Sequence, residues 1–117
     1  MSKQLTKEQL VRSAWLTELR RQGHRQCTGL YFLDSAAGRY VCALGLLIEI
    51  AVPKNAQTLV AKHGTQGSIG ELAGLSPYQT DQVVQMNDGD RIGQTCDPMP
   101  FAAIADEVER WFADETL

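Results

Sequence analysis

Residues 39–53 read RYVCALGLLIEIAVP, and this stretch decides the fold. The segment up to Val41 follows a strand pattern, whereas the segment from Cys42 onward is too uniformly apolar for a surface strand. The simplest interpretation is a buried helix that Pro53 ends, because proline disfavours helical backbone in the residue before it. Gly45 would let a neighbouring segment pack close to this helix. We therefore predict a strand-to-helix junction at the centre of the molecule.

The sequence before this junction predicts one helix and the first strand of a hairpin. Thr6, with Gln9 three residues later, is typical of a helix start, and apolar residues recur at helical spacing until Gly23. Residues 28–33 are rich in strand formers, and residues 34–38 are typical of a turn. Together with the strand of the junction, they predict a short β-hairpin.

The C-terminal half predicts several short helices. Residues 54–63 favour a weak helix, and residues 68–75 and 77–86 favour two short helices joined by a turn. Residues 87–95 are typical of a Gly-rich loop, and the Asp-Pro pair at 97–98 predicts the start of a last amphipathic helix. The apolar stripe of that helix consists of Phe101, Ile104, Ala105, Val108, Trp111 and Phe112.

Length and composition fit one small core. The chain has 117 residues, of which 44% are hydrophobic. We expect an α+β fold, mostly α, with about five short helices packed around one β-hairpin in a single compact domain, residues 1–117. Within it, the helix over residues 44–50 should be central, with the first and last helices packed on it. No run of about 18 apolar residues and no signal-peptide pattern occurs, so we expect a soluble, cytoplasmic protein without membrane association.

Three segments resemble a known family. Residues 39–47 read RYVCALGLL, residues 83–89 read VVQMNDG, and residues 101–108 read FAAIADEV. Over roughly residues 15–112 the chain resembles a family of small, uncharacterised bacterial and phage-encoded proteins. Its members share a Tyr-Cys-(Cys/Ala)-Leu-Gly-(Val/Leu)-Leu junction and a Met-Asn-Asp loop before a Phe-x-x-Ile-Ala-Asp helix. The resemblance implies no established activity, and the family's occurrence in phage and mobile contexts implies a host-takeover or defence-related role.

Charges are segregated along the chain. The net charge is −3, but residues 1–62 carry nine Lys or Arg against four acids, and residues 63–117 carry two against ten. In one small domain the two halves can interleave and neutralise each other, which is the simplest interpretation. The acidic candidates for a partner-binding surface are Asp88, Asp90, Asp106, Glu107 and Glu109. The basic candidates, expected on the outer face of the first helix and just after it, are Arg12, Arg20, Arg21 and Arg25.

These surfaces favour a non-catalytic accessory or regulatory protein that binds another macromolecule. A protein partner on the acidic surface is the favoured reading, because exposed carboxylates attract a partner's arginines. Nucleic acid is the other possible partner, through the basic surface. The sequence implies no cofactor, since it contains neither a phosphate-cradling Gly-rich loop followed by Lys nor a Ser nucleophile elbow. An enzyme is therefore disfavoured.

Residues 66–86 give an alternative, a DNA-binding helix-turn-helix. The positions that fit this motif are Ile69, Gly70, Ala73, Gly74, Leu75 and Ser76. The second helix, residues 77–86, offers Gln79 and Gln82 for adenine edges but no Lys or Arg for phosphates. A helix-turn-helix regulator thus stays an alternative to a protein-binding module.

The candidate metal ligands lack the spacing of a metal site. Cys27, Cys42 and Cys96 form neither an even disulfide set nor a paired metal spacing, so we expect reduced thiols. Zinc could gather these thiols with His24, but no two cysteines form a knuckle. The acidic loop at residues 87–93 suggests calcium, yet its spacing fails the EF-hand pattern. We therefore expect no metal.

Cys42 is the main enzymatic candidate. It sits at the predicted start of a helix, where the helix dipole would lower the thiol pKa. His24 or His63 could act as its base, with Asp34 orienting that base. A thiol among apolar residues is more often part of the core, so a small thiol-dependent enzyme is the second alternative.

Overall fold

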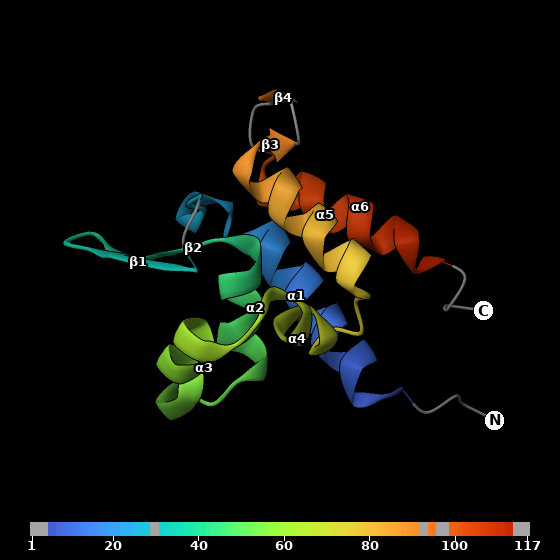
Figure 1. Ribbon diagram of the computed structural model, residues 1–117, viewed down its shortest axis with the longest axis horizontal. Coiled ribbons are helices and arrows are strands. Elements are labelled where there is room, and N and C mark those ends of the chain that lie inside the picture. The colour runs from blue at the N-terminus through green and yellow to red at the C-terminus, as the bar shows by residue number, and fades with distance from the viewer. Residues whose placement is uncertain (1–4, 29–30, 92–93, 96–98, 114–117) are drawn as a thin grey trace.

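The computed structural model of the chain describes residues 5–28, 31–91, 94–95 and 99–113. Over these residues the fold is mostly helical with two short antiparallel hairpins, which confirms the predicted α+β class (Figure 1). The helices are α1 (Lys7–Arg21), α2 (Ala43–Ala51), α3 (Gln57–His63), α4 (Gln66–Glu71), α5 (Pro77–Asp88) and α6 (Phe101–Trp111), with single 3-10 turns at Gly23–Arg25 and Lys54–Ala56. The strands are β1 (Phe32–Ser35), β2 (Gly38–Val41), β3 (Asp90–Arg91) and β4 (Gln94–Thr95). Within this described part, no helix has the length and apolar character needed to cross a membrane.

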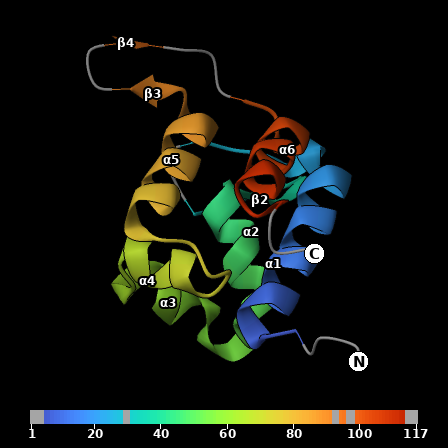
Figure 2. The same ribbon diagram turned by 90° about the vertical axis from the view of Figure 1, so that its right-hand side faces the viewer.

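α2 forms the centre of the helical body. Every residue from Ala43 to Ile48 is buried, as the uniformly apolar sequence predicts. α1, α3, α4 and α5 all contact α2, whereas α6 packs chiefly against α1 and to a smaller extent against α5 (Figure 2). The last helix therefore reaches the core beside α1 instead of lying mainly on α2 as expected.

α1 begins at the predicted capping box. Thr6 Oγ1 accepts a hydrogen bond from the Gln9 amide at 3.1 Å, and Gln9 Oε1 accepts one from the Thr6 amide at 2.8 Å. Trp15 and Leu19 are fully buried on the inner face of the helix. Trp15 Nε1 donates to the Ala43 carbonyl at 2.9 Å, so the indole fixes α1 to the start of α2 without leaving a buried donor unpaired.

The predicted hairpin is present, with a tighter turn. β1 and β2 pair antiparallel with Ser35 opposite Gly38, which leaves a two-residue turn in place of the predicted turn over residues 34–38. Ser35 Oγ closes this turn by donating to the Gly38 carbonyl at 3.0 Å. β1 begins at Phe32, later than the predicted strand over residues 28–33. The hairpin projects from one side of the helical body (Figure 1).

α5 is longer than predicted. It continues to Asp88, so the predicted loop over residues 87–95 is wrong at its start. Gly89 ends the helix in the left-handed region, with φ of 75°, and the chain then forms β3 and β4. α6 begins at Phe101, and the predicted start at residues 97–98 lies outside the described residues.

Leu47 offers a direct test of the core. Its side chain has no exposed surface, so Leu47→Ala removes buried methyl groups and leaves a cavity. We expect the free energy of unfolding, measured in urea, to fall by about 3 kcal/mol. Leu59→Ala on α3 is the matched control, because Leu59 is 61% exposed and its loss should cost little. A loss below about 1 kcal/mol for Leu47→Ala would contradict a core position for α2.

Candidate functional site

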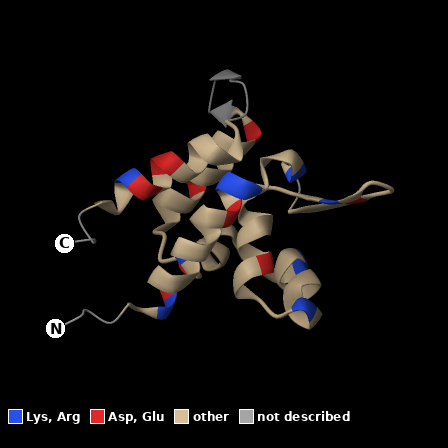
Figure 3. Cartoon of the chain, turned by 180° about the vertical axis from the view of Figure 1, so that it is seen from behind, with Lys and Arg blue, Asp and Glu red and all other residues tan. Residues whose placement is uncertain are grey.

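The predicted acidic and basic surfaces meet between α1 and α6. Arg20 Nη2 lies 2.9 Å from Asp106 Oδ1 and 2.8 Å from Glu109 Oε2. The hydrogen bond to Asp106 is the main cause of a raised Arg20 pKa. Basic and acidic residues are interspersed over the helical body (Figure 3). The two halves of the sequence therefore partly neutralise each other in space.

Arg12 is buried, contrary to the expected position on the outer face of α1. It is three residues from Trp15 and shares its inward face. Arg12 Nη1 donates to the Ala73 carbonyl at 3.0 Å, and the guanidinium carbon lies 3.6 Å from the centroid of the Phe112 ring. Arg12 therefore contributes to the packing of α1 against the turn after α4 and the end of α6.

Arg25 and Arg21 are also engaged within the fold. Arg25 donates to both carboxylate oxygens of Glu49 at 3.0 Å and to the Arg39 carbonyl at 2.9 Å. Arg21 pairs with Glu18 of the same helix at 2.8 Å. Among the described residues, the predicted basic surface is therefore divided among several local contacts and gives no continuous cationic face.

The acidic candidates also lie at separate places and do not form one surface. Asp88 lines a cavity beside α2, whereas Glu107 lines a groove between α5 and α6. Glu107 also pairs with Arg110 at 3.2 Å. The side chain of Asp90 lies outside the described part of the structure. The groove is consequently the place where an acidic candidate meets exposed aromatic surface.

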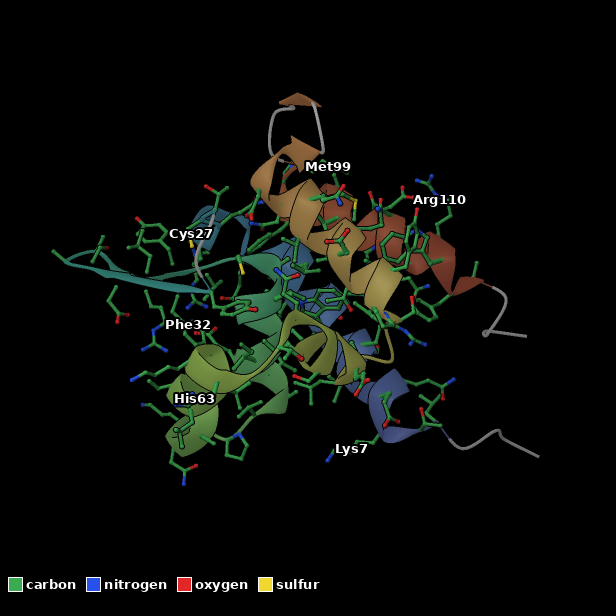
Figure 4. The ribbon with its side chains drawn as sticks, in the orientation of Figure 1. Lys7, Cys27, Phe32, His63, Met99 and Arg110 are labelled. Carbon is green, nitrogen blue, oxygen red and sulfur yellow. The ribbon has the colours of Figure 1, made fainter. Side chains whose placement is uncertain are left out.

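An open groove of about 590 Å³ runs between α5 and α6. Its lining includes Tyr78, Gln79, Gln82, Met99, Glu107 and Trp111. Tyr78 is 73% exposed, and Trp111 is only partly covered by the core. Figure 4 shows Met99 beside the C-terminal end of α5, where its amide donates to the Met86 carbonyl at 2.8 Å. Aromatic and Met side chains inside a polar rim are typical of protein-binding surfaces.

α4 and α5 form the predicted two-helix unit. Gly70 packs so closely on α5 that a Cβ there would lie 1.8 Å from Thr80 Oγ1. Gly74 takes the left-handed φ of 75° in the turn, and Ser76 caps α5 in a reciprocal pair with Gln79. The left-handed glycine and the serine cap are features that the motif requires, but the charged residues of α5 are all acidic, which opposes phosphate contact.

Cys42 caps α2, and its thiol is unsuited to act as a nucleophile. Its Sγ accepts a hydrogen bond from the Gly45 amide at 3.3 Å. Burial nevertheless raises the pKa of the Cys42 thiol to about 11. The expected lowering by the helix start is therefore wrong, because loss of water outweighs the stabilisation of the thiolate by backbone amides.

The residues proposed to activate Cys42 are exposed, whereas Cys42 is buried. His24 is exposed on the 3-10 turn after α1, and His63 is exposed on α3. Asp34 pairs with Arg39 across the hairpin at 2.9 Å instead of orienting a histidine. The described side chains thus give no support to a catalytic triad.

The candidate metal ligands are not gathered either. Across residues 5–28, 31–91, 94–95 and 99–113, no three His, Cys, Asp or Glu side chains group to hold a metal ion. Cys96 of the zinc set and Gly93 of the calcium loop lie outside the described residues. Asn87 and Asp88, which open the calcium loop in the sequence, belong to α5.

The raised pKa predicts low reactivity for Cys42. At pH 7 only about one thiol in ten thousand is ionised when the pKa is about 11, and the thiolate is the nucleophile. We expect iodoacetamide to leave Cys42 unmodified in the folded protein at neutral pH and to modify it in urea, as read by peptide mass spectrometry. Labelling of folded Cys42 at the rate of an ordinary free thiol would restore the enzymatic reading.

Asn87 is the polar centre of the fold, a role that the sequence reasoning missed. Its side chain is 1% exposed, and Oδ1 accepts a hydrogen bond from the Ala43 amide at 3.1 Å. Nδ2 donates to the Cys27 carbonyl at 2.9 Å. The sequence predicted that Asn87 lies in a Gly-rich loop, but its side chain instead joins the Met-Asn-Asp segment to the start of α2.

Gln26 extends this network to the last helix. Its Nε2 donates to the Met99 carbonyl at 2.7 Å, and its Oε1 accepts from the Phe101 amide at 3.1 Å. Gln26 thereby supplies the cap that Pro100 cannot provide at the start of α6. No local sequence pattern signals this role, because the two residues it holds are more than 70 positions away.

No protein-family model, curated protein or solved structure matches this chain. The resemblance to a family of bacterial and phage-encoded proteins therefore stays a prediction.

Proposed function

We propose that the protein is a non-catalytic accessory protein that binds another protein through the groove between α5 and α6. The observation that carries this proposal is Tyr78, a large aromatic side chain that is 73% exposed at the edge of the groove. Tyr and Trp are enriched among the residues that dominate binding energy at protein interfaces. Trp111 and Met99 add apolar surface in the same groove.

The charge around the groove supports a basic partner segment. Asp81 on α5 is exposed, and Glu107 lies within the groove. On the outer side of α6, Asp106 and Glu109 share a single arginine, Arg20. α5 and α6 together carry five acidic residues against one basic residue, Arg110, so a partner carrying Lys or Arg would associate faster and bind more weakly at high salt.

The sequence also supports a cellular compartment and a biological context for this binding. The odd cysteine count favours reduced thiols and hence action in the cytoplasm. The resemblance to phage-encoded proteins supports a role associated with phage or other mobile elements.

Capture followed by reconstitution tests the proposal. The full chain would be used as bait in host lysate, and the captured protein would then be purified and titrated. We expect Tyr78→Ala to weaken the complex by at least about tenfold, because an aromatic side chain would be lost from the interface. Glu107→Gln should weaken it less and reduce its dependence on salt.

Leu10→Ala is the matched control for Tyr78→Ala. Leu10 is 56% exposed but lies on α1, away from the groove lining. Both variants should melt close to the unchanged protein, since exposed side chains contribute little to stability. Equal affinity of Tyr78→Ala and the unchanged protein, or failure to reconstitute any captured complex, would overturn the groove as the binding site.

DNA binding by α5 is the second candidate, favoured by the close contact of Gly70 with Thr80 and by the left-handed Gly74. Gln79 and Gln82 would be its base-reading side chains. A gel shift at low salt with a duplex library would show retardation that Gln82→Ala abolishes. Absence of retardation under those conditions would remove this candidate, because non-specific affinity is highest at low salt.

A further inference from the structure

A second cavity lies between α2 and α5, on the face of α5 away from the groove. Its volume is about 330 Å³, at the lower end of the range for small-molecule sites. Its lining includes Tyr31, Cys42, Leu44, Gln66, Val84 and Asp88. Most of the lining is apolar, and the polar groups come from a few side chains. The cavity therefore has the composition of a binding site for a small, mainly apolar group.

The walls of this cavity are held in place by the core. Leu44 is 1% exposed and Val83 is fully buried, so the apolar wall belongs to the packed interior. Asn87 bonds the start of α2 to α5 through the Ala43 amide, and the Cys42 amide donates to the Tyr31 carbonyl at 3.2 Å. A cavity already formed by such contacts requires little ordering when a ligand enters.

The lining includes an acidic side chain. Among the described residues that line the cavity, Asp88 is the one Asp, Glu, Lys or Arg. Asn87 Nδ2 donates to Asp88 Oδ1 at 3.0 Å, which orients the carboxylate. Burial raises the pKa of both Cys42 and Tyr31, so the thiol and the phenol stay neutral. A ligand would thus meet one carboxylate beside neutral and apolar surface.

We propose that this cavity binds an organic cation, with an ammonium or guanidinium group at Asp88 and a small apolar body against Leu44 and Val84. A hydrogen bond from a charged donor to a carboxylate is about twice as strong as one between neutral groups. The apolar wall adds affinity in proportion to the area removed from water. The cation has two possible sources, a free small amine or the Lys or Arg side chain of another protein. The site is separate from the α5–α6 groove and does not rest on the function proposed for that groove.

Binding of defined amines tests this inference. The ¹⁵N-labelled full chain would be titrated by NMR with phenethylamine and agmatine, with the neutral 2-phenylethanol and the anionic 3-phenylpropionate as comparison compounds. We expect saturable shifts of the amides of Leu44, Val84 and Asp88 with at least one amine. The neutral compound should bind at least about tenfold more weakly, and the anion should not bind. N-acetyl-lysine amide and N-acetyl-arginine amide form the second arm, and a tighter response to them than to the free amines would assign a partner's side chain as the source.

Two variants separate charge from shape. Asp88→Asn should weaken amine binding by at least about tenfold, whereas Asp81→Asn, on the same helix but outside the cavity lining, should leave it unchanged. Val84→Phe should abolish binding by filling the cavity, with a folded NMR spectrum as its control.

Three outcomes would overturn the inference. They are equal affinity for amine and alcohol, retention of amine binding by Asp88→Asn, and no saturable shift with any amine at millimolar concentration. Tyr78→Ala should not alter amine binding, so failure of the groove proposal would be recognised separately.

Discussion

Replacing Asn87 by Ala should lower the free energy of unfolding by about 4 kcal/mol, well beyond the effect of a typical surface change. The side chain is 1% exposed, and its amide joins α5 to two other segments, residues 26–27 and the start of α2. Oδ1 accepts from the Ala43 amide and, at 3.3 Å, from Gln26 Nε2, while Nδ2 donates to the Cys27 carbonyl. Alanine would leave the buried Ala43 amide and the half-buried Cys27 carbonyl without this partner, and each such group costs about 1–3 kcal/mol.

Urea melts followed by circular dichroism would measure this loss. Gln85→Ala is the matched control, because Gln85 lies two residues earlier on α5 and its side-chain amide donates to Asp81 Oδ2 at 2.7 Å on the surface. We expect the control to change stability by less than about 0.5 kcal/mol. A loss below about 1 kcal/mol for Asn87→Ala would contradict the central role of this network.

Local signals in the sequence predicted the elements of the fold well. The Thr6 and Gln9 pair predicted the start of α1, the pattern of residues 77–86 predicted α5, and the apolar run after Cys42 predicted the buried α2. Each of these signals depends on residues within one turn or on a hydrophobic period. Such patterns are set by the chain itself and need no knowledge of tertiary contacts.

The site was less predictable, because its contacts join residues far apart in the sequence. Asn87 meets Ala43 across 44 positions, and Arg20 meets Asp106 across 86. A charge count could suggest that the two halves attract each other, but it could not show that Arg12 turns inward while Arg20 bridges to α6. The thiol of Cys42 illustrates a further limit, since helix position and burial act on its pKa in opposite directions and only the packed structure shows that burial dominates.

The interleaved charges also change what a charge-reversal experiment would report. Asp106 and Glu109 are exposed, but both bind Arg20. Converting the two acids to Lys would place like charges beside Arg20 and lower stability together with any effect on binding. Glu107→Gln and Tyr78→Ala probe the groove more cleanly, because they do not remove the partners of Arg20.

Gly45→Ala should be as damaging as Asn87→Ala. We expect it to lower the free energy of unfolding by at least about 4 kcal/mol or to prevent folding. A Cβ at this position would lie 2.0 Å from the Tyr31 carbonyl oxygen and 2.9 Å from its carbon. Tyr31 cannot move away freely, since the same oxygen accepts the Cys42 amide at 3.2 Å, just before α2. Helix propensity alone predicts the opposite sign, a gain of about 1 kcal/mol, because alanine favours a helix over glycine.

Gly67→Ala supplies the comparison within the same protein. Gly67 is also helical, in α4, but a Cβ there meets no other atom within 4 Å. We expect Gly67→Ala to raise the free energy of unfolding by about 0.5 kcal/mol, chiefly by restricting the unfolded chain. Urea melts of the two variants should therefore move in opposite directions. If both variants were stabilised, the backbone of Tyr31 would not lie against α2, and the strand-to-helix junction at residues 39–53 would need a different geometry.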